Sequence, residues 1–167
     1  MKIDEGFSEE EVLHILRHKS RDNSRTPVQW DSTPNAGFTK GTPWIDVAEN
    51  FNEINAAVAL NEKDSIFYHY KQLIELRKQY DVITWGDFQL IYKNHPEIFA
   101  YVRNWQDEKL LVVNNFYGKE TDFTLPNEVD ASNMQAEILL TNYDDSSINY
   151  KKLTLRPYES IVYYLTK

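Results

Sequence analysis

Cysteine is absent from the 167-residue sequence, and basic residues are scarce. Without cysteine the chain has no disulfide bonds, no thiolate catalysis and no cysteine-ligated zinc, a composition that fits the reducing cytoplasm. The 18 Lys and Arg residues stand against 26 Asp and Glu, which gives a net charge of −8. Because this acidic balance argues against binding to nucleic acid or to an anionic membrane, we expect neither as a partner.

A long apolar run is also missing. No stretch approaches the roughly 18 apolar residues that a membrane span needs, and no charged start leads into the apolar core of a signal peptide. The 167 residues can bury a real core, but they fall well short of the roughly 250 residues of a (β/α)8 barrel. The sequence therefore predicts one compact domain, or one domain with an appendage.

Two helices are expected in the first half of the chain. Ser8 and Glu11 form an S-x-x-E capping box, and the apolar residues that follow have helical spacing, which predicts a helix over residues 8–19. A second helix is predicted over residues 65–80. Its apolar stripe, which we expect to dock on the second half of the chain, consists of Ile66, Phe67, Tyr70, Leu73 and Ile74.

The segment between these helices, residues 21–55, shows no period. Proline, glycine, Asp and Asn residues punctuate it, and a loop of this length in a compact domain is usually functional or a linker. A solvated linker does not fit, because the segment carries several large apolar side chains. Four of them are the rings of Trp30, Phe38, Trp44 and Phe51. We therefore expect this loop to lie against another surface.

From Val82 onward the period of apolar residues changes to two, which predicts strands. The predicted strands cover residues 84–93, 98–103, 110–116, 121–125, 135–141, 152–155 and 160–165. Short strands without intervening helices predict an antiparallel β-sandwich or Greek-key barrel. The predicted core consists of Phe88, Leu90, Phe99, Tyr101, Leu111, Val113, Phe123, Ile138, Leu140, Ile161 and Tyr163. The fold class is thus predicted as α+β, with the boundary between residues 1–81 and residues 82–167.

Histidines and the familiar catalytic motifs offer little chemistry. His14 and His18 are four residues apart on one face of a predicted helix, a spacing that can hold a divalent metal. No third ligand is in sight, so we favour a solvent-facing pair. We expect neither a metal nor another cofactor.

One segment of the loop carries a dense set of hydrogen-bonding side chains. Residues 19–31 contain Arg21, Arg25 and Gln29 together with Asp and Asn residues, and Trp30 adds a flat apolar face. Sugars are bound by this mixture, because polar groups match the hydroxyls and an aromatic ring covers the C–H side. The alternative is that the two arginines pair with carboxylates and pin an irregular loop. The residues alone leave both interpretations open.

The same segment carries a family resemblance. The string SRDNSRTPVQWD at residues 20–31, followed by PNAGF at 34–38 and PWI at 43–45, resembles the oligo-1,6-glucosidases and related α-glucosidases of the α-amylase superfamily. Val28 stands where relatives commonly carry Met or Phe. The resemblance continues through residues 53–55, 64–68, 73–78, 98–103, 109–113 and 155–159. It therefore covers nearly the whole chain from about residue 19.

The resemblance implies the last third of such an enzyme. Full members carry a (β/α)8 barrel, an inserted subdomain and a C-terminal β-domain, and they are retaining glycosidases with an Asp nucleophile, a Glu acid/base and a third Asp. None of the motifs that carry these acids is found in this sequence, so we expect no catalytic residue here. Residues 1–81 would be the end of the barrel, and residues 82–167 the C-terminal β-domain.

The resemblance also implies roles for four residues of the loop. Arg21 would reach the glucose in the −1 subsite, and Arg25 would brace the neighbouring acids. Gln29 and Trp30 are weaker candidates, which would belong to the wall of the loop. These four residues are the candidate substrate-binding residues, and the implied ligands are α-glucosides.

The expected function follows from this family. We expect a C-terminal fragment of an intracellular α-glucosidase that hydrolyses the α-1,6 bonds of isomalto-oligosaccharides, with the fragment inactive alone and its β-domain stabilising the barrel. The alternative is a stand-alone carbohydrate-binding or structural β-sandwich. The sequence does not choose among isomaltose, dextran ends, trehalose 6-phosphate, sucrose and maltose. Without a barrel, we expect the loop's rings to be buried against the chain's own β-domain or against a second copy.

Overall fold

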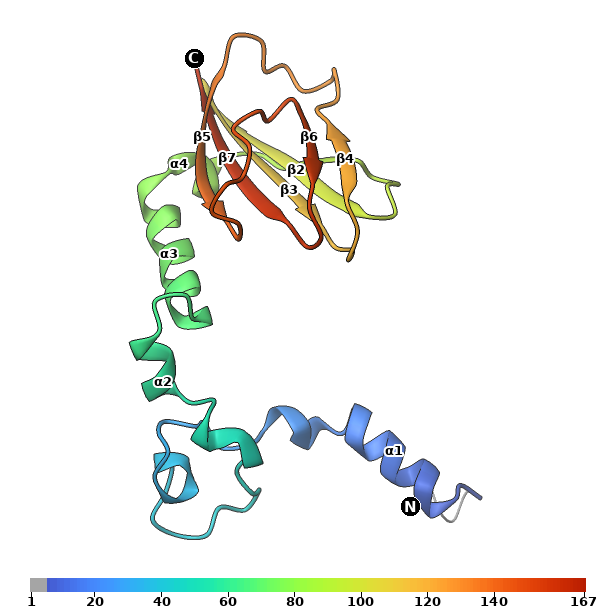
Figure 1. The fold of residues 1–167 in the computed structure, drawn as a ribbon, viewed down its shortest axis with the longest axis vertical. Coiled ribbons are helices and arrows are strands. Elements are labelled where there is room, and N and C mark those ends of the chain that lie inside the picture. Colours follow the sequence, from blue (N-terminus) through green and yellow to red (C-terminus); the bar gives the residue numbers. More distant parts are fainter. Residues whose placement is uncertain (1–5) are drawn as a thin grey trace. The chain divides into compact units, whose positions relative to one another are not determined.

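The structure is a computed structural model that describes residues 6–167, apart from the side chain of Asn23. It divides into two compact units, the first ending at Lys71 and the second running from Gln72 to Lys167. The boundary lies inside helix α3 (Ile66–Gln79), which Figure 1 shows in green. The predicted boundary between a barrel part and a β-domain, at residues 81 and 82, stays a prediction.

The first helix of the first unit confirms the predicted capping box. Helix α1 covers Glu9–Lys19, and the Ser8 side chain accepts a hydrogen bond from the Glu11 backbone N–H at 3.2 Å. The Glu11 carboxylate in turn accepts from the Ser8 backbone N–H at 2.8 Å. This bond lowers the pKa of Glu11, with a further contribution from the Ser8 hydroxyl. The helix therefore begins where its sequence supplies partners for its unpaired N–H groups.

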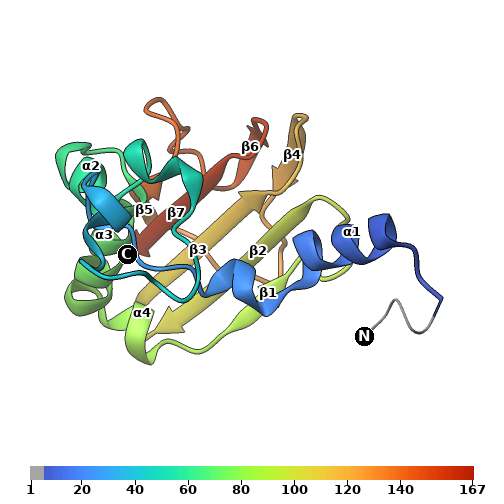
Figure 2. The ribbon, with the colours of Figure 1, turned by 90° about the horizontal axis from the view of Figure 1, so that it is seen from below.

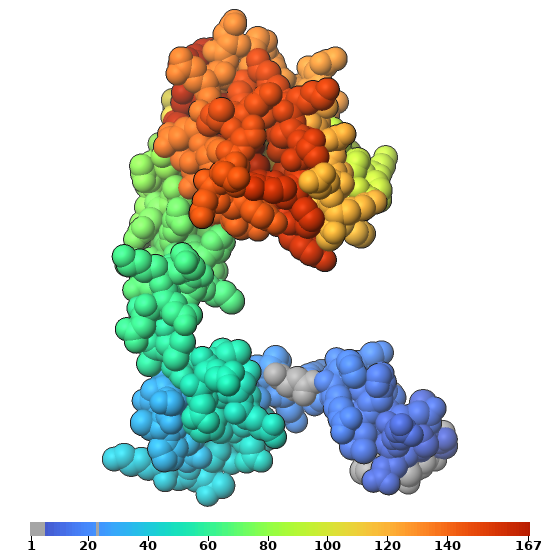
Figure 3. Space-filling view, viewed as in Figure 1, coloured from blue at the N-terminus to red at the C-terminus, as the bar shows by residue number. Residues whose placement is uncertain are grey.

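The loop that follows contains short helical turns. Three 3-10 turns cover Arg21–Ser24 (η2), Pro34–Gly37 (η3) and Glu49–Asn52 (η4), and a short helix, α2, covers Ala56–Asn61. Helix α2 was not predicted. Asn55 caps it, because its side-chain oxygen accepts a hydrogen bond from the Val58 N–H at 2.9 Å. In the space-filling view the loop and α2, blue to teal, pack against one another (Figure 3).

Helix α3 confirms the predicted second helix to within one residue at each end. Leu73 and Ile74, the two residues of its apolar stripe that belong to the second unit, are 40% and 44% exposed, and the docking of the stripe on the second half of the chain stays a prediction. A further helix, α4 (Asp81–Trp85), packs on the sheet through the fully buried Val82, beside Leu110 and Val112. Residues 84–85 therefore end a helix and do not begin a strand.

The second unit holds two antiparallel sheets. The larger has the strand order β1 (Gln89–Ile91), β2 (Ile98–Trp105), β3 (Glu108–Asn115), β7 (Ser160–Thr166) and β5 (Gln135–Thr141). The smaller pairs β4 (Thr121–Thr124) with β6 (Lys152–Leu155). Figure 2 shows β2, β3 and β7 side by side. Side chains of both sheets share one core, as in a β-sandwich, so the predicted fold class is confirmed.

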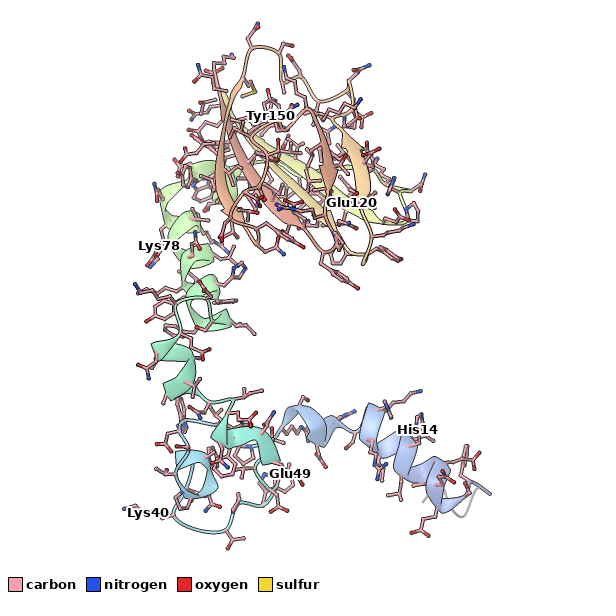
Figure 4. All side chains as sticks on the ribbon, viewed as in Figure 1. His14, Lys40, Glu49, Lys78, Glu120 and Tyr150 are labelled. Carbon is pink, nitrogen blue, oxygen red and sulfur yellow. The ribbon has the colours of Figure 1, made fainter. Side chains whose placement is uncertain are left out.

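The core is formed by alternate strand positions. Leu111, Val113, Phe123, Ile161 and Tyr163 are buried as predicted, and Leu90, Tyr101, Ile138 and Leu140 are partly buried. Tyr150, labelled in Figure 4, lies in this core and donates hydrogen bonds to the carbonyls of Ala131 and Met134 at 3.1 and 3.0 Å. The Tyr150 hydroxyl therefore has hydrogen-bond partners although it is buried among apolar side chains.

Two predicted core residues are exposed, and two more lie on the other face of the larger sheet: Tyr101 packs against the cluster that contains Val82, and Leu90 pairs with Tyr101. Phe88 is 60% exposed and Phe99 is 42% exposed. On β2 the residues that face the core are Ile98, Ala100 and Val102, so Phe99 points to the opposite face of the sheet. The alternation was recognised correctly, but a shift of one residue exchanges the two faces of a strand.

The rings of the loop are largely left uncovered by the first unit itself. Trp30 is 54% exposed and Trp44 is 82% exposed, while Phe38 is exposed and Phe51 half-buried. The loop closes its hydrogen bonds on its own turns and on α2. Burial of these rings against the β-domain or against a second copy stays a prediction. None of the helices in the described part of the chain is long and apolar enough to cross a membrane.

Candidate substrate-side loop

The candidate site begins at turn η2. Ser20 caps this turn by accepting a hydrogen bond from the Asp22 N–H at 3.3 Å, and the Ser24 hydroxyl donates to the Arg21 carbonyl at 2.9 Å. The side chains of Arg21 and Arg25 are both exposed, and Arg25 lies 3.9 Å from the Asp22 carboxylate. An exposed ion pair of this length contributes little to stability. Two guanidinium groups are thus presented at the start of the loop.

Gln29 lies further along the loop and braces it. Its side-chain amide donates to the Ile54 carbonyl and to the Asn50 side-chain oxygen, the second at 3.4 Å. Its backbone carbonyl accepts from the Ala56 N–H at 2.9 Å. The half-buried Gln29 therefore ties the QWD segment to the residues that precede and begin α2, which is a structural role for its amide.

Trp30 is held through its backbone on both sides. Its N–H donates to the Ala36 carbonyl at 2.8 Å, and its carbonyl accepts from the Ala57 N–H at 3.0 Å. The indole itself remains half exposed. The structure therefore brings Gln29 and Trp30 together against α2, whereas Arg21 and Arg25 stand on the η2 turn.

The acceptor for Trp30 belongs to a left-handed turn. Asn35, Ala36 and Gly37 have φ values of 56°, 56° and 67°. Asn and Gly tolerate this region, but an alanine in it costs about 1–2 kcal/mol. Ala36 is also fully buried. Asn35 and Gly37 are typical turn residues, but the left-handed turn itself could not be predicted from the sequence, because alanine gives no signal for it.

Asp31 completes this turn. Its carboxylate accepts from the Thr33 N–H at 2.8 Å and from the Thr33 hydroxyl, and these bonds lower the pKa of Asp31, the hydroxyl most. The φ of Gly37 favours glycine, and a Cβ there would lie 2.7 Å from the Asp31 carboxylate oxygen, so an added side chain would force this carboxylate to move. Asp31 is therefore ionised at neutral pH and serves the turn as an acceptor, which is not the state of a general acid.

The two histidines of α1, His14 and His18, contact each other. The rings of His14 and His18 lie 4.3 Å apart, and His18 Nδ1 is 2.8 Å from the His14 carbonyl oxygen. Among residues 6–167, no group of three or more His, Asp and Glu side chains could hold a metal ion.

The loop itself presents cations, hydrogen-bonding groups and an exposed aromatic ring, an arrangement that suits the binding of a ligand.

Two sequence profiles match this chain. The alpha-amylase catalytic domain matches residues 1–86, and the alpha-amylase SusG C-terminal domain matches residues 98–162. The chain belongs to the α-amylase family. The expectation from the RDNSRTPVQWD segment is thereby confirmed at the level of the family.

Relatives with a stated activity cover nearly all of the chain. The trehalose-6-phosphate hydrolase of Bacillus subtilis is 56% identical over 98% of the chain, and the oligo-1,6-glucosidase of Bacillus cereus is 47% identical over 98%. The solved trehalose-6-phosphate hydrolase of Bacillus licheniformis is 57% identical and superposes with a TM-score of 0.92 over 98% of the chain. The chain spans about 30% of the length of these relatives.

Proposed function

We propose that this chain works as the C-terminal part of a retaining α-glucosidase and supplies the loop on the substrate side and the β-domain. The observation that carries the proposal is the match of 98% of the chain to glucoside hydrolases, at 56% identity in one of them. Retaining hydrolysis needs two carboxyl groups about 5 Å apart. In this proposal the barrel of the family supplies those groups, and the chain alone is inactive.

The substrate class is α-glucosides, with two candidates. Isomalto-oligosaccharides are suggested by the oligo-1,6-glucosidases, of which that of Bacillus cereus is 47% identical. Trehalose 6-phosphate is favoured by the two Bacillus hydrolases that are 56% and 57% identical. Identity does not separate the two activities cleanly, because the Escherichia coli trehalose-6-phosphate hydrolase is only 40% identical.

Arg21 is the proposed contact to the substrate. Its guanidinium is exposed on η2, and a guanidinium is a strong donor to oxygen acceptors in a closed site. Arg25, whose guanidinium lies 3.9 Å from the Asp22 carboxylate, would brace the neighbouring acids. Trp30 would line the wall, and Gln29 would hold the loop together.

The β-domain, residues 82–167, is proposed to stabilise the barrel. Exposed apolar side chains in both units support this proposal. In the first unit they include the stripe residues of α3 up to Tyr70, and in the second unit they include Phe88, Phe99 and Phe116. In the isolated chain a second copy would cover such surfaces instead, and a concentration-independent mass of 19.7 kDa in light scattering would exclude that. The absence of cysteine supports a cytoplasmic location.

A chimera tests the proposal. The chain replaces the matching part of the Bacillus subtilis trehalose-6-phosphate hydrolase, and hydrolysis of trehalose 6-phosphate and isomaltose is measured. We expect turnover of at least one of these sugars within about tenfold of the unsubstituted hydrolase on its own substrate. The isolated chain should release no glucose.

Two outcomes would contradict the proposal. A folded chimera that hydrolyses neither sugar would show that the chain does not complete an α-glucosidase. Binding of isomaltose by the isolated chain in isothermal calorimetry, together with an inactive chimera, would favour a carbohydrate-binding module instead.

A further inference from the structure

We propose that the left-handed turn Asn35–Gly37 is a positioning device that fixes Trp30 as an aromatic contact for a glucosyl ring. This inference rests on the proposed function of the loop. It assigns roles to Asn35, Ala36 and Gly37, which the motif did not suggest, and it makes Trp30 a specific substrate contact.

The hydrogen bonds of the segment support this role. The Ala36 carbonyl accepts from two consecutive N–H groups, those of Trp30 at 2.8 Å and Asp31 at 3.3 Å. The Trp30 carbonyl is held by the Ala57 N–H. With both of its backbone polar groups bonded, the backbone of Trp30 is held in place, so the turn and α2 set the direction of its Cα–Cβ bond and thereby where the indole starts. A binding group needs such support to hold its geometry.

The conformation of the turn is a second argument. The left-handed backbone of Ala36 aims its carbonyl at Trp30, and Ala36 keeps this conformation although glycine would adopt it without strain. Asn35 holds the exit of the turn by donating to the carbonyls of Thr39 and Gly41 at 3.1 and 2.9 Å. Strained backbone concentrates at sites where geometry matters for function.

The exposed indole identifies the ligand chemistry. Within this chain the Trp30 side chain is 54% exposed on a fixed backbone, so a ligand can reach its ring. A flat aromatic face binds the C–H side of a pyranose, and the guanidinium groups of Arg21 and Arg25, earlier in the same loop, suit its hydroxyls. The ligand class is therefore a glucosyl residue, the ring that isomaltose and trehalose 6-phosphate have in common.

The experiment is a double-mutant cycle in the chimera described above. Gly37→Ala places a Cβ 2.7 Å from the Asp31 carboxylate and disturbs the turn, and Trp30→Ala removes the ring. We expect each single variant to raise KM for isomaltose and trehalose 6-phosphate about tenfold and to leave kcat within about threefold. The double variant should resemble Trp30→Ala alone, because the turn acts through Trp30. Trp30→Phe should restore KM to within about threefold of the unsubstituted chimera.

Gly41→Ala is the matched control. Gly41 lies in the same loop, but its φ is not in the left-handed region and the nearest atom to an added Cβ is the Thr39 hydroxyl oxygen at 3.8 Å. This variant should leave KM unchanged. If Gly37→Ala does not fold, Asn35→Ala takes its place, because it removes the two bonds at the exit of the turn.

Different results would overturn different statements. An active chimera in which Gly37→Ala leaves KM unchanged, or in which the effects of Gly37→Ala and Trp30→Ala on KM multiply, would refute the positioning role alone. A fall in kcat at constant KM would also refute it, since the turn would then serve catalysis or folding. An unsubstituted chimera without activity would refute the proposed function and this role with it.

Discussion

Arg21 and Arg25 differ in their surroundings although they share a motif. Arg25 faces the Asp22 carboxylate within its own turn, at 3.9 Å. The carbonyl of Arg21 is held by Ser24, and its exposed side chain starts from a fixed backbone position. In a closed sugar site, the guanidinium of Arg21 can donate charge-assisted hydrogen bonds to the sugar, whereas Arg25 already has a carboxylate beside it. The two arginines are therefore expected to respond differently to substitution.

Arg21→Ala in the chimera should lower kcat/KM for α-glucosides about 100-fold, because a charge-assisted hydrogen bond in a closed site is lost. Arg21→Lys should recover only part of this loss, since a lysine cannot reproduce the planar fork of donors. Lys40→Ala removes an exposed cation of the same loop, visible in Figure 4, and should change nothing. Thermal melts of all variants should coincide. Activity of Arg21→Ala within about threefold of the unsubstituted chimera would make Arg21 a scaffold residue.

Single residues of the site could be predicted from sequence only in part. The mixture of cations, amides and an indole in one segment fitted both a sugar-binding loop and a loop pinned by ion pairs, and the string of residues indicated the family. The role of Gln29 could not be predicted, because its partners, Asn50 and Ile54, lie 21 and 25 residues away and no local pattern links them. The left-handed turn was hidden for a different reason, since Ala36 has no preference for that conformation.

Among whole elements, the two long helices and most strands followed from periodicity. Strand β5 and strand β6 have the predicted bounds, and α1 and α3 begin and end within one residue of the prediction. Helix α4 was missed because Val82, Ile83 and Thr84 are β-branched and favour strands, whereas packing of Val82 on the sheet decides the outcome. The face of β2 was misassigned because both of its faces carry apolar residues and the pattern alone does not say which face is covered.

The turn between β6 and β7 holds the most deeply buried carboxylate of the β-unit's described residues, that of Glu159, which is 3% exposed. It accepts from the Arg156 backbone N–H at 2.8 Å, from the Arg156 guanidinium at 2.8 Å and from the Ser146 hydroxyl at 2.6 Å. Burial raises the pKa of Glu159, but the bonds from Arg156 and Ser146 outweigh it, so the pKa is lowered. The turn between β6 and β7 therefore depends on an ionised Glu159 carboxylate.

This dependence predicts a loss of stability in acid. A carboxyl whose folded pKa is depressed stabilises the protein fully above its unfolded pKa, about 4.5, and the contribution is lost as pH falls from there through the folded pKa. Glu159→Gln should lower the free energy of unfolding at pH 7 by about 2 kcal/mol. It should also shrink the difference between pH 7 and acid in urea melts. Glu120→Gln, at an exposed position of the same unit, is the control. If Glu159→Gln leaves the difference in stability between pH 7 and acid unchanged, the ionised Glu159 carboxylate does not cause the loss of stability in acid.

On the scale of the whole molecule, apolar burial is distributed unequally. Among the described residues up to 71, the buried apolar residues are Pro27 and Ala36. The second unit contains a contiguous cluster of 16 buried side chains from both sheets and from the segments that connect their strands. Because burial of apolar surface is the main favourable term in folding, the second unit has a core of its own and the first unit does not. The first unit is held by local hydrogen bonds, which contribute less.

Limited proteolysis of the isolated chain should report this difference. Regions with few buried apolar contacts open with little free energy, so trypsin should cut the loop first, after the exposed Lys40. A later product should begin inside α3, at Gln72 or Lys78, and extend to the C-terminus, because the sandwich keeps its core. Mass spectrometry of a time course identifies these products. In the chimera, where the barrel would cover the loop, cleavage after Lys40 should slow. Early cuts after Arg103 or Lys109, inside β2 and β3, would mean that the sandwich is not the stable unit, and equal cleavage after Lys40 in both proteins would mean that nothing covers the loop.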